Sequence, residues 1–323
     1  MRVGYIGGFW STNIGNSFYN LGALWLLQEV FGQENVFFVP DPPQVYWSSL
    51  NTDYDLISKL DLDLVVVSGP ILGSVLLDIY IKKFDAIVAR GGSIGFLSAG
   101  AISYSEEEAD LVGEFLNKYP IKFFFTRDNK TYDLYKNRLN TVVYNGLCTS
   151  MYLNNALTPV PVDDNYVVYN FSYFHDPIIV RSNNEWSVRR RVLSPVQREI
   201  EKYPIVRIKS SPYMPNIKFF KSTKFVYPRP NMYFSDLPHG YLSILKSAKY
   251  VFSDRVHTCA AGLIFGSSCM YIKGGKRSND GRNNLFLRLG LPEIYNRPVS
   301  LDFSYIEAEK ERMTKELAVI IPS

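Results

Sequence analysis

The chain has few residues of the kinds that build disulfides and metal sites, with three cysteines and three histidines in 323 residues. Cys148, Cys259 and Cys269 are odd in number and lack the spacing of a metal site or of a CxxC motif. We therefore expect reduced thiols, as in a cytoplasmic protein, and no disulfide framework. There is also no HExxH motif and no paired Cys/His set, so the sequence predicts no metal.

A strong charge of one sign and long apolar runs are also missing. The net charge is +4, and the basic triplet 189–191 is short and isolated, so we expect no nucleic-acid binding. A small basic excess suits anionic substrates such as phosphates and carboxylates. No window approaches the ~20 apolar residues of a membrane span, and the N-terminus leads directly into a strand. We expect no signal peptide, a cytoplasmic location and at most peripheral membrane contact.

The length and the order of elements favour two α/β domains. A chain of 323 residues exceeds the usual size of one core. In the first half, short apolar runs predict strands at 3–6, 36–39, 64–67, 93–97, 121–126 and 141–144. Helical patterns between them predict helices at 17–31, 75–88, 106–119 and 129–139. Alternation of this kind predicts a parallel, doubly wound sheet.

The segment 154–165 contains proline and has no periodicity, so we place a domain boundary there, between residues 157 and 158. The second half then repeats the α/β plan. Its predicted strands are 166–171, 205–209, 224–226, 250–252 and 269–272. Its predicted helices are 194–203, 240–247, 256–265, 283–289 and 305–319. We expect two Rossmann-like doubly wound domains that face each other across a cleft, as in glycosyltransferase-B proteins, with a last helix able to pack back on the first domain.

The loop 7–16 joins the first strand to the first helix and is rich in glycine. Glycines let a backbone approach a ligand closely, and the first amides of the following helix attract anions. The loop lacks the GxGxxG pattern of a dinucleotide site, which excludes NAD. Two interpretations stay open: a purely structural turn, or a binding loop in which the amides of Asn13 and Asn16 hold a substrate hydroxyl.

Arg255 and His257 follow an apolar strand and begin a helix, at the edge where open α/β sheets bind ligands. A guanidinium matches carboxylate or phosphate, and an imidazole can act as an acid or a base near neutral pH. The structural alternative is a local ion pair between Asp254 and Arg255, with His257 as an ordinary helix-start residue. We favour the functional interpretation.

Two further sites carry cations at strand ends. Arg127 follows a predicted strand of the first half, where it would face an anion across the cleft, while Asp128 would cap the next helix. The loop 274–282 combines glycine with basic residues and follows a strand of the second half. It would clasp a phosphate or a nucleotide, or else remain a solvated loop. The basic residues concerned are Lys276, Arg277 and Arg282.

Four pieces in order resemble the polysaccharide pyruvyl transferase family: Asn13-Ile14-Gly15-Asn16 with the following Leu21-Gly22, Ser93-Ile94-Gly95, Thr126-Arg127-Asp128, and Ser253-Asp254-Arg255-Val256-His257. In the last, Val256 stands where the family has Leu. The chain departs from the family pattern at Ser68-Gly69-Pro70 and at Cys148-Thr149-Ser150. Both departures lie in the first half, which the resemblance makes the acceptor side, leaving the second half as the donor side.

The resemblance implies an enzyme that transfers a pyruvyl group from phosphoenolpyruvate to two hydroxyls of a sugar, with formation of a ketal. It implies no cofactor besides phosphoenolpyruvate as co-substrate, and a saccharide acceptor that is free, lipid-linked or nucleotide-linked. The catalytic residues would be Arg127, Arg255 and His257. The substrate-binding residues would be Asn13, Gly15, Asn16, Ser93, Lys276, Arg277 and Arg282. The alternatives are a glycosyltransferase that uses a nucleotide sugar and an inactive, carbohydrate-binding relative.

Overall fold

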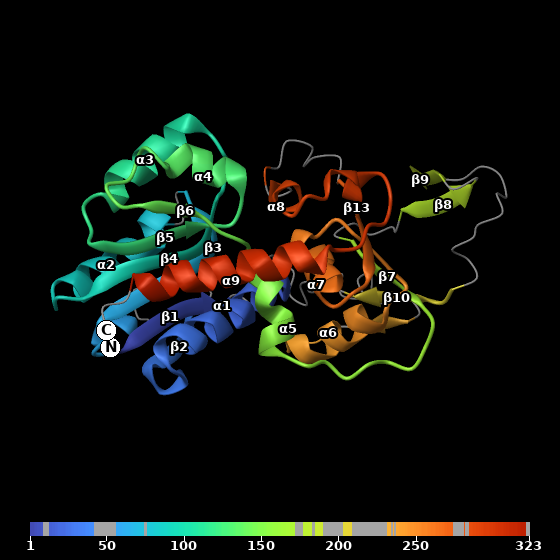
Figure 1. Cartoon of the computed structure of the whole chain (residues 1–323), viewed down its shortest axis with the longest axis horizontal. Coiled ribbons are helices and arrows are strands. Elements are labelled where there is room, and N and C mark those ends of the chain that lie inside the picture. The colour runs from blue at the N-terminus through green and yellow to red at the C-terminus, as the bar shows by residue number, and fades with distance from the viewer. Residues whose placement is uncertain are drawn as a thin grey trace, which may run out of the picture.

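The computed structural model describes residues 1–8, 13–41, 56–73, 76–171, 177–182, 185–189, 203–208, 231–233, 235, 237–273, 281 and 284–320. Two parallel sheets lie side by side in the molecule, and each has helices packed on it (Figure 1). The first sheet lies before residue 146 and the second after residue 166, so the predicted boundary falls in the segment that joins them.

Among the described residues, the first sheet has the strand order β2-β1-β3-β4-β5-β6, with every pair parallel. The strands are β1 (Val3–Gly8), β2 (Val36–Asp41), β3 (Leu64–Leu72), β4 (Ser93–Ala101), β5 (Ile121–Thr126) and β6 (Val143–Asn145). The chain moves to opposite sides of β1 to form β2 and β3. The order therefore reverses between β1 and β3, which is where such sheets open a ligand crevice.

Helices cover both faces of the first sheet because its strands are apolar on both. In β3, Leu64 and Val66 belong to one buried cluster, while Val65 and Val67 belong to another. This alternation of faces with a period of two is the geometry of a strand, and continuous apolar runs fit a sheet buried on both sides. The helices are α1 (Gly15–Phe31), α2 (Ile81–Val88), α3 (Glu106–Leu116) and α4 (Asn129–Tyr135).

The second sheet has the order β11-β10-β7-β12-β13 within the described residues, and it is also parallel. Its strands are β7 (Val167–Asn170), β10 (Ile205–Ile208), β11 (Met232–Tyr233), β12 (Tyr250–Ser253) and β13 (Ser268–Tyr271), and its helices are α6 (Pro238–Ser247), α7 (Val256–Ile264) and α8 (Asn284–Arg288). Here the order reverses between β7 and β12, which gives the second half its own crevice. The prediction of two doubly wound sheets is confirmed.

One antiparallel hairpin was not predicted. Strands β8 (Ile178–Ser182) and β9 (Glu185–Arg189) pair with each other beside the second sheet (Figure 1). Trp186 holds the hairpin in place through ring contacts with Tyr250 and Phe252 of β12. The helix predicted at 194–203, apart from residue 203, and the strand predicted at 224–226 lie outside the described residues.

The last helix, α9 (Phe303–Val319), returns to the first half and lies along it (Figure 1). The hydroxyl of Tyr152 donates to the carbonyl of Lys310 at 3.0 Å. The buried ammonium of Lys310 donates in turn to the side-chain oxygens of Asn154 and Asn155 at 2.8 and 2.7 Å. The chain therefore crosses between the two halves twice, once in the segment 146–166 and once before α9.

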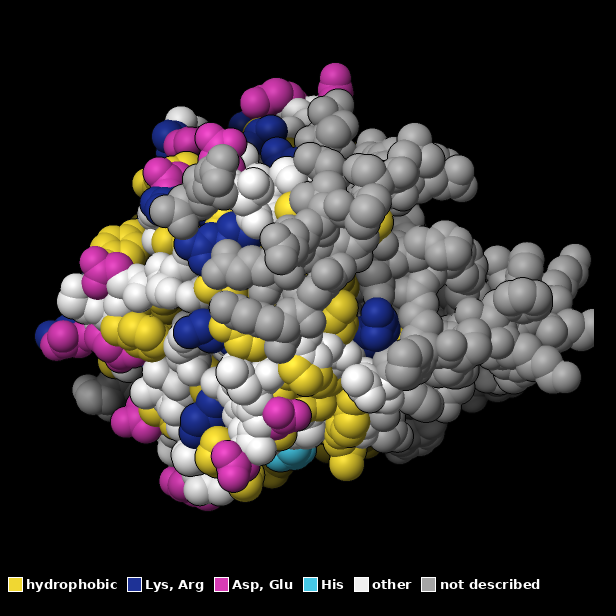
Figure 2. Space-filling model, turned by 90° about the vertical axis from the view of Figure 1, so that its right-hand side faces the viewer, with side chains coloured by type: hydrophobic (Ala, Val, Ile, Leu, Met, Phe, Trp, Pro, Cys, Tyr) yellow, Lys and Arg dark blue, Asp and Glu magenta, His cyan; other side chains and the backbone are white. Residues whose placement is uncertain are grey.

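On the face seen in Figure 2, the described Lys and Arg side chains are spread among apolar and polar ones and form no extended patch among the described residues. Cys148, Cys259 and Cys269 are buried and form no disulfide. None of the described helices combines the length and the apolar character needed to cross a bilayer.

Candidate active site

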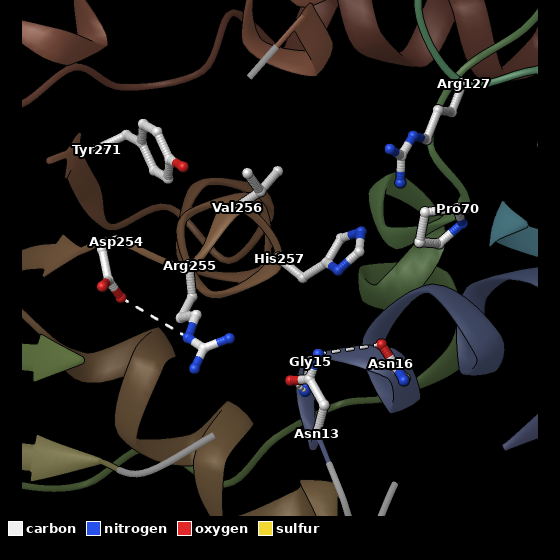
Figure 3. Close-up of a pocket in the computed structure, with 10 residues that line it drawn as sticks. All are labelled: Asn13, Gly15, Asn16, Pro70, Arg127, Asp254, Arg255, Val256, His257 and Tyr271. Carbon is white, nitrogen blue, oxygen red and sulfur yellow. Dashed lines mark hydrogen bonds and ion pairs between the residues drawn. The ribbon is translucent and has the colours of Figure 1, made fainter. Parts of the chain in front are cut away.

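A pocket of about 540 Å³, part of it open solvent, lies where the carboxyl ends of the two sheets meet (Figure 3). The first half contributes Asn13, Gly15, Asn16, Pro70 and Arg127 to its lining. The second half contributes Asp254, Arg255, Val256, His257 and Tyr271. Both topological crevices therefore open into one shared space.

The loop after β1 is shaped by short side-chain contacts. The amide nitrogen of Asn13 donates to the side-chain oxygen of Asn16 at 3.2 Å, and the backbone N–H of Gly15 donates to Asn13 Oδ1 at 3.2 Å. A Cβ atom added to Gly15 would lie 3.4 Å from Cβ of His257. The start of α1 therefore lies beside the start of α7, and residues of both helix starts line the pocket.

A buried network fixes the turn that carries Arg255. Ser253 Oγ accepts from the backbone N–H of Arg255 at 2.9 Å and donates to the carbonyl of Asn170 at 2.9 Å. The side chain of Asn170 also donates to the carbonyl of Ile208 at 2.7 Å and accepts from the hydroxyl of Thr258 at 3.1 Å. Strands β7, β10 and β12 are therefore joined to α7 at the edge of the site. Sequence reasoning missed Asn170, whose only signal is a polar residue at the end of an apolar strand.

Arg255 lies at the N-cap position of α7 with 28% of its side chain exposed. Its Nε atom is 3.7 Å from a carboxylate oxygen of Asp254, so the local ion pair of the structural interpretation is present. Arg255 also lines the pocket, with its guanidinium directed toward the loop of Asn13 and Gly15 (Figure 3). The ion pair and the position in the pocket lining therefore coexist.

His257 is the second residue of α7 and is half-buried. Its ring lies against the ring of Tyr19, with 4.9 Å between centroids and an angle of 52° between planes. In Figure 3 the imidazole is directed to the side of the pocket formed by Pro70 and Asn16. The histidine of one half therefore contacts residues that the other half supplies.

Arg127 enters the pocket from the end of β5 and is 2% exposed. One terminal nitrogen donates to the hydroxyl of Tyr104 at 3.3 Å, and Nε lies 3.5 Å from a carboxylate oxygen of Asp128. Burial acts to lower the pKa of Arg127, but the electrostatic effects of Tyr104 and Asp128 are stronger together and raise it. The guanidinium therefore stays positively charged although it is buried.

Asp128 has the structural role that the sequence suggested. Its Oδ1 atom accepts from the backbone N–H of Thr131 at 2.8 Å, which caps α4. Its other oxygen accepts from the hydroxyls of Tyr104 and Thr131 at 3.0 and 3.1 Å. The carboxylate is thus fully engaged beside the pocket and holds its neighbours in position.

The structure places Ser93 away from this site, which corrects its assignment as a substrate-binding residue. It is the first residue of β4, and its hydroxyl donates weakly to the carbonyl of Asp63 at 3.4 Å. The strand runs on to Ala101, so about 25 Å of extended chain separates Ser93 from the edge that meets the pocket. The prediction ended this strand at residue 97, four residues too early. Lys276, Arg277 and Arg282 lie outside the described residues.

The two departures from the family pattern have different surroundings. Gly69 has a φ of +91°, a conformation that favours glycine, and the next residue, Pro70, lines the pocket. Residues 148–150 are buried, and the hydroxyl of Thr149 donates to the carbonyl of Tyr19 at 2.8 Å. The first departure is therefore part of the pocket wall, and the second supports α1 from behind.

The arrangement is suited to a small anion. Two cationic side chains, one from each half, converge beside an imidazole and the amino ends of two helices. Within the part of the chain that the structure describes, no three His, Cys, Asp or Glu side chains come together as a metal site would require.

A model of the polysaccharide pyruvyl transferase family matches residues 13–273 of the chain. The protein belongs to this family. All ten residues that line the pocket fall within the matched region. The pocket of this polysaccharide pyruvyl transferase family member therefore lies within the part of the chain that matches the family. No curated protein matches the chain significantly.

Solved structures similar to this polysaccharide pyruvyl transferase family member include MnaA from S. aureus, in a co-structure with UDP. It has a TM-score of 0.53 and 13% identity, over 98% of this chain and 89% of that one. A proposed UDP-N-acetylglucosamine 2-epimerase from Listeria monocytogenes has a TM-score of 0.50 and 10% identity, over 98% and 90% of the two chains. At these identities the likeness shows the fold alone, which is glycosyltransferase-B-like, with two Rossmann-like domains across a cleft.

Proposed function

We propose that this protein transfers a pyruvyl group from phosphoenolpyruvate to two hydroxyls of a saccharide, which forms a cyclic ketal and releases phosphate. The observation that supports the proposal best is that Arg127, Arg255 and His257 line one pocket although they come from different halves of the chain. The family to which the chain belongs points to the same chemistry.

The charges of the donor match the side chains of the pocket. Phosphoenolpyruvate carries a carboxylate and a phosphate, and each group can accept two parallel hydrogen bonds from a guanidinium. Arg127 and Arg255 approach the pocket from opposite sides (Figure 3), so we assign one arginine to each anionic group. The amino end of α7 lies at the pocket, so the dipole of this helix also favours a bound anion.

The reaction needs one proton donor and strong charge stabilisation. One sugar hydroxyl adds to C2 of the enol, its proton is lost, and the methylene C3 gains a proton. A second hydroxyl then replaces the phosphate at C2, and its proton balances the charge of the phosphate that leaves. We assign His257 as the acid that protonates C3 or the departing phosphate. The two arginines stabilise the charge that develops, which supplies the larger share of the rate.

The acceptor is proposed to be a saccharide that is free, lipid-linked or nucleotide-linked, and phosphoenolpyruvate is the only small co-substrate in the scheme. The start of α1 and the end of β3 supply Asn13, Asn16 and Pro70 to the first-half wall of the pocket, and we place the acceptor against them. An amide side chain can both donate to and accept from a sugar hydroxyl.

The test measures phosphate released by the purified protein from phosphoenolpyruvate with a panel of free, lipid-linked and nucleotide-linked saccharides. We expect phosphoenolpyruvate to raise the melting temperature and one acceptor class to release phosphate. Nucleotide release from a nucleotide sugar, without any effect of phosphoenolpyruvate, would instead establish glycosyl transfer. Ligand binding without turnover on any acceptor would establish an inactive carbohydrate-binding relative.

A further inference from the structure

Tyr104 lies between β4 and α3 in an unusual backbone conformation. It is buried, and its φ of +58° places a bulky residue in the left-handed region. That conformation is costly for any residue except glycine, and the surrounding structure must hold it. Such positions gather at functional sites.

The hydroxyl of Tyr104 joins the two charged residues at the end of β5. It donates to a carboxylate oxygen of Asp128 at 3.0 Å and accepts from a terminal nitrogen of Arg127 at 3.3 Å. Asp128 is fixed in turn by Thr131 at the start of α4. The tip of Arg127 is thereby tied to a hydroxyl whose own position is set by a helix cap.

Residues of β4 fix the backbone and the side-chain stem of Arg127. Its backbone N–H donates to the carbonyl of Ala99 at 3.0 Å, and a Cβ atom added to Gly100 would lie 2.1 Å from Nε. The side chain therefore crosses directly over the backbone of Gly100. The Tyr104 contact then fixes one end of the fork, and the guanidinium points into the pocket (Figure 3).

Tyr104 also contacts the second half of the molecule. A Cβ atom on Gly281 would lie 2.3 Å from the Tyr104 ring, so the backbone at Gly281 rests directly on that ring. Gly281 belongs to the predicted basic loop 274–282. Tyr104 does not appear among the described residues that line the pocket, so it acts through Arg127 and not on a ligand.

We propose that Tyr104 is a positioning residue that holds the Arg127 guanidinium in the pocket, and that its contact with Gly281 makes this position depend on the approach of the two halves. The inference rests on the proposed function, because it assumes that Arg127 binds the anionic donor. Loss of the hydroxyl should leave Arg127 charged but free to rotate, so it should weaken anion binding more than it slows the chemical step.

The test compares Tyr104→Phe with Tyr119→Phe. Tyr119 is a matched control because its hydroxyl donates to a carboxylate oxygen of Asp85 at 2.8 Å in the same domain, away from the pocket. We expect Tyr104→Phe to raise the KM for phosphoenolpyruvate about tenfold, with kcat within about threefold of wild type. Tyr119→Phe should change neither. A KM within twofold of wild type for Tyr104→Phe, or an equal effect of both variants, would overturn the proposal.

A second measurement separates this proposal from the proposed reaction. Calorimetry gives the Kd of inorganic phosphate and of phosphoenolpyruvate for wild type, Tyr104→Phe, Arg127→Ala and the double variant. When Arg127 is present, we expect Tyr104→Phe to raise the Kd of each anion about tenfold. In the Arg127→Ala background, the same substitution should raise the Kd by less than twofold. If wild type binds phosphate but never turns over phosphoenolpyruvate, the reaction is refuted, while the phosphate Kd still decides the role of Tyr104. Equal effects in both backgrounds, or no anion binding by wild type, would overturn that role.

Discussion

Tyr19 and His257 come from opposite halves of the chain and lie ring against ring, 4.9 Å apart between centroids. Tyr19 belongs to α1 and His257 to α7, and the backbone of α1 also contacts the stem of His257 at Gly15. The orientation of the imidazole therefore depends on the packing of the two halves. Substitutions in the first half should consequently affect the chemistry assigned to a residue of the second.

Replacement of the proposed acid should stop turnover without unfolding the protein. His257→Ala removes the proton donor, so we expect phosphate release to fall by a factor of at least 10². His257 is half-buried at a helix start, so the melting temperature should change by only a few degrees. His239→Ala is the control, because His239 is exposed in the first turn of α6. Wild-type rates from purified His257→Ala would refute the assignment.

Arg255→Lys should fail although the charge is kept. An ammonium cannot form the two parallel hydrogen bonds that a guanidinium gives to carboxylate or phosphate. We expect kcat/KM for phosphoenolpyruvate to fall about 10- to 100-fold. Arg297→Lys serves as the control, since Arg297 forms an exposed i,i+4 pair with Glu293. Steady-state kinetics of the two variants provide the measurement. Equally small changes in kcat/KM for both variants would show that Arg255 contributes only its charge.

Gly69→Ala should lower activity by displacing Tyr19. The φ of +91° makes any side chain at this position strained, and the new Cβ would lie 2.7 Å from the Tyr19 ring. Gly91→Ala is a matched control, with a φ of +83° and open space around the added atom. Both variants should lose about 1 kcal/mol of stability to backbone strain. Only Gly69→Ala should also lose activity, because Tyr19 supports His257. Equal rates for the two variants would contradict this chain of contacts.

Acid should weaken the attachment of α9 through Glu309. Burial acts to raise the pKa of Glu309, but hydrogen bonds from Arg312 and Arg288 are stronger together and hold it below its ordinary value of 4.5. A carboxylate with a lowered folded-state pKa stabilises the fold above its ordinary pKa, and that contribution is lost as the pH falls further.

Glu309→Gln should therefore lower the melting temperature at pH 7 and reduce the loss of stability between pH 5 and pH 3. Glu311→Gln on the same helix is the control, because its pair with Lys315 is exposed and screened by solvent. Thermal melts across this pH range provide the measurement. An identical pH dependence of the melting temperature for wild type and Glu309→Gln would show that the ionisation of Glu309 does not stabilise the fold.

The alternation of strands and helices could be predicted because each apolar run carries its own signal. Val65 and Val66 mark a strand buried on both faces, and the strand predicted at 121–126 has the bounds that the structure shows. The hairpin of β8 and β9 gave no such signal, because its stability comes from Trp186 packing on β12. Contacts of this kind join residues far apart in the chain and have no local pattern.

The candidate site could be predicted to the extent that it lies at strand ends. Arg127, Arg255 and His257 each follow a parallel strand, and parallel strands bring their carboxyl ends to one edge. Ser93 does not follow this rule, because it begins its strand and so lies at the amino end of the sheet, opposite the edge that meets the pocket. Tyr104 has no sequence signal, because its role follows from a left-handed backbone and from a contact with the other half.

The return of α9 to the first half has a consequence for how the protein is made. Ile306, Met313 and Leu317 complete the same buried cluster as Leu147 and Met151, yet they leave the ribosome after the whole second sheet. Nascent domains usually fold in order of synthesis. Here the first sheet must keep part of its apolar surface uncovered until α9 has been synthesised, so a ribosome stalled near residue 300 would hold a chain prone to chaperone binding or aggregation.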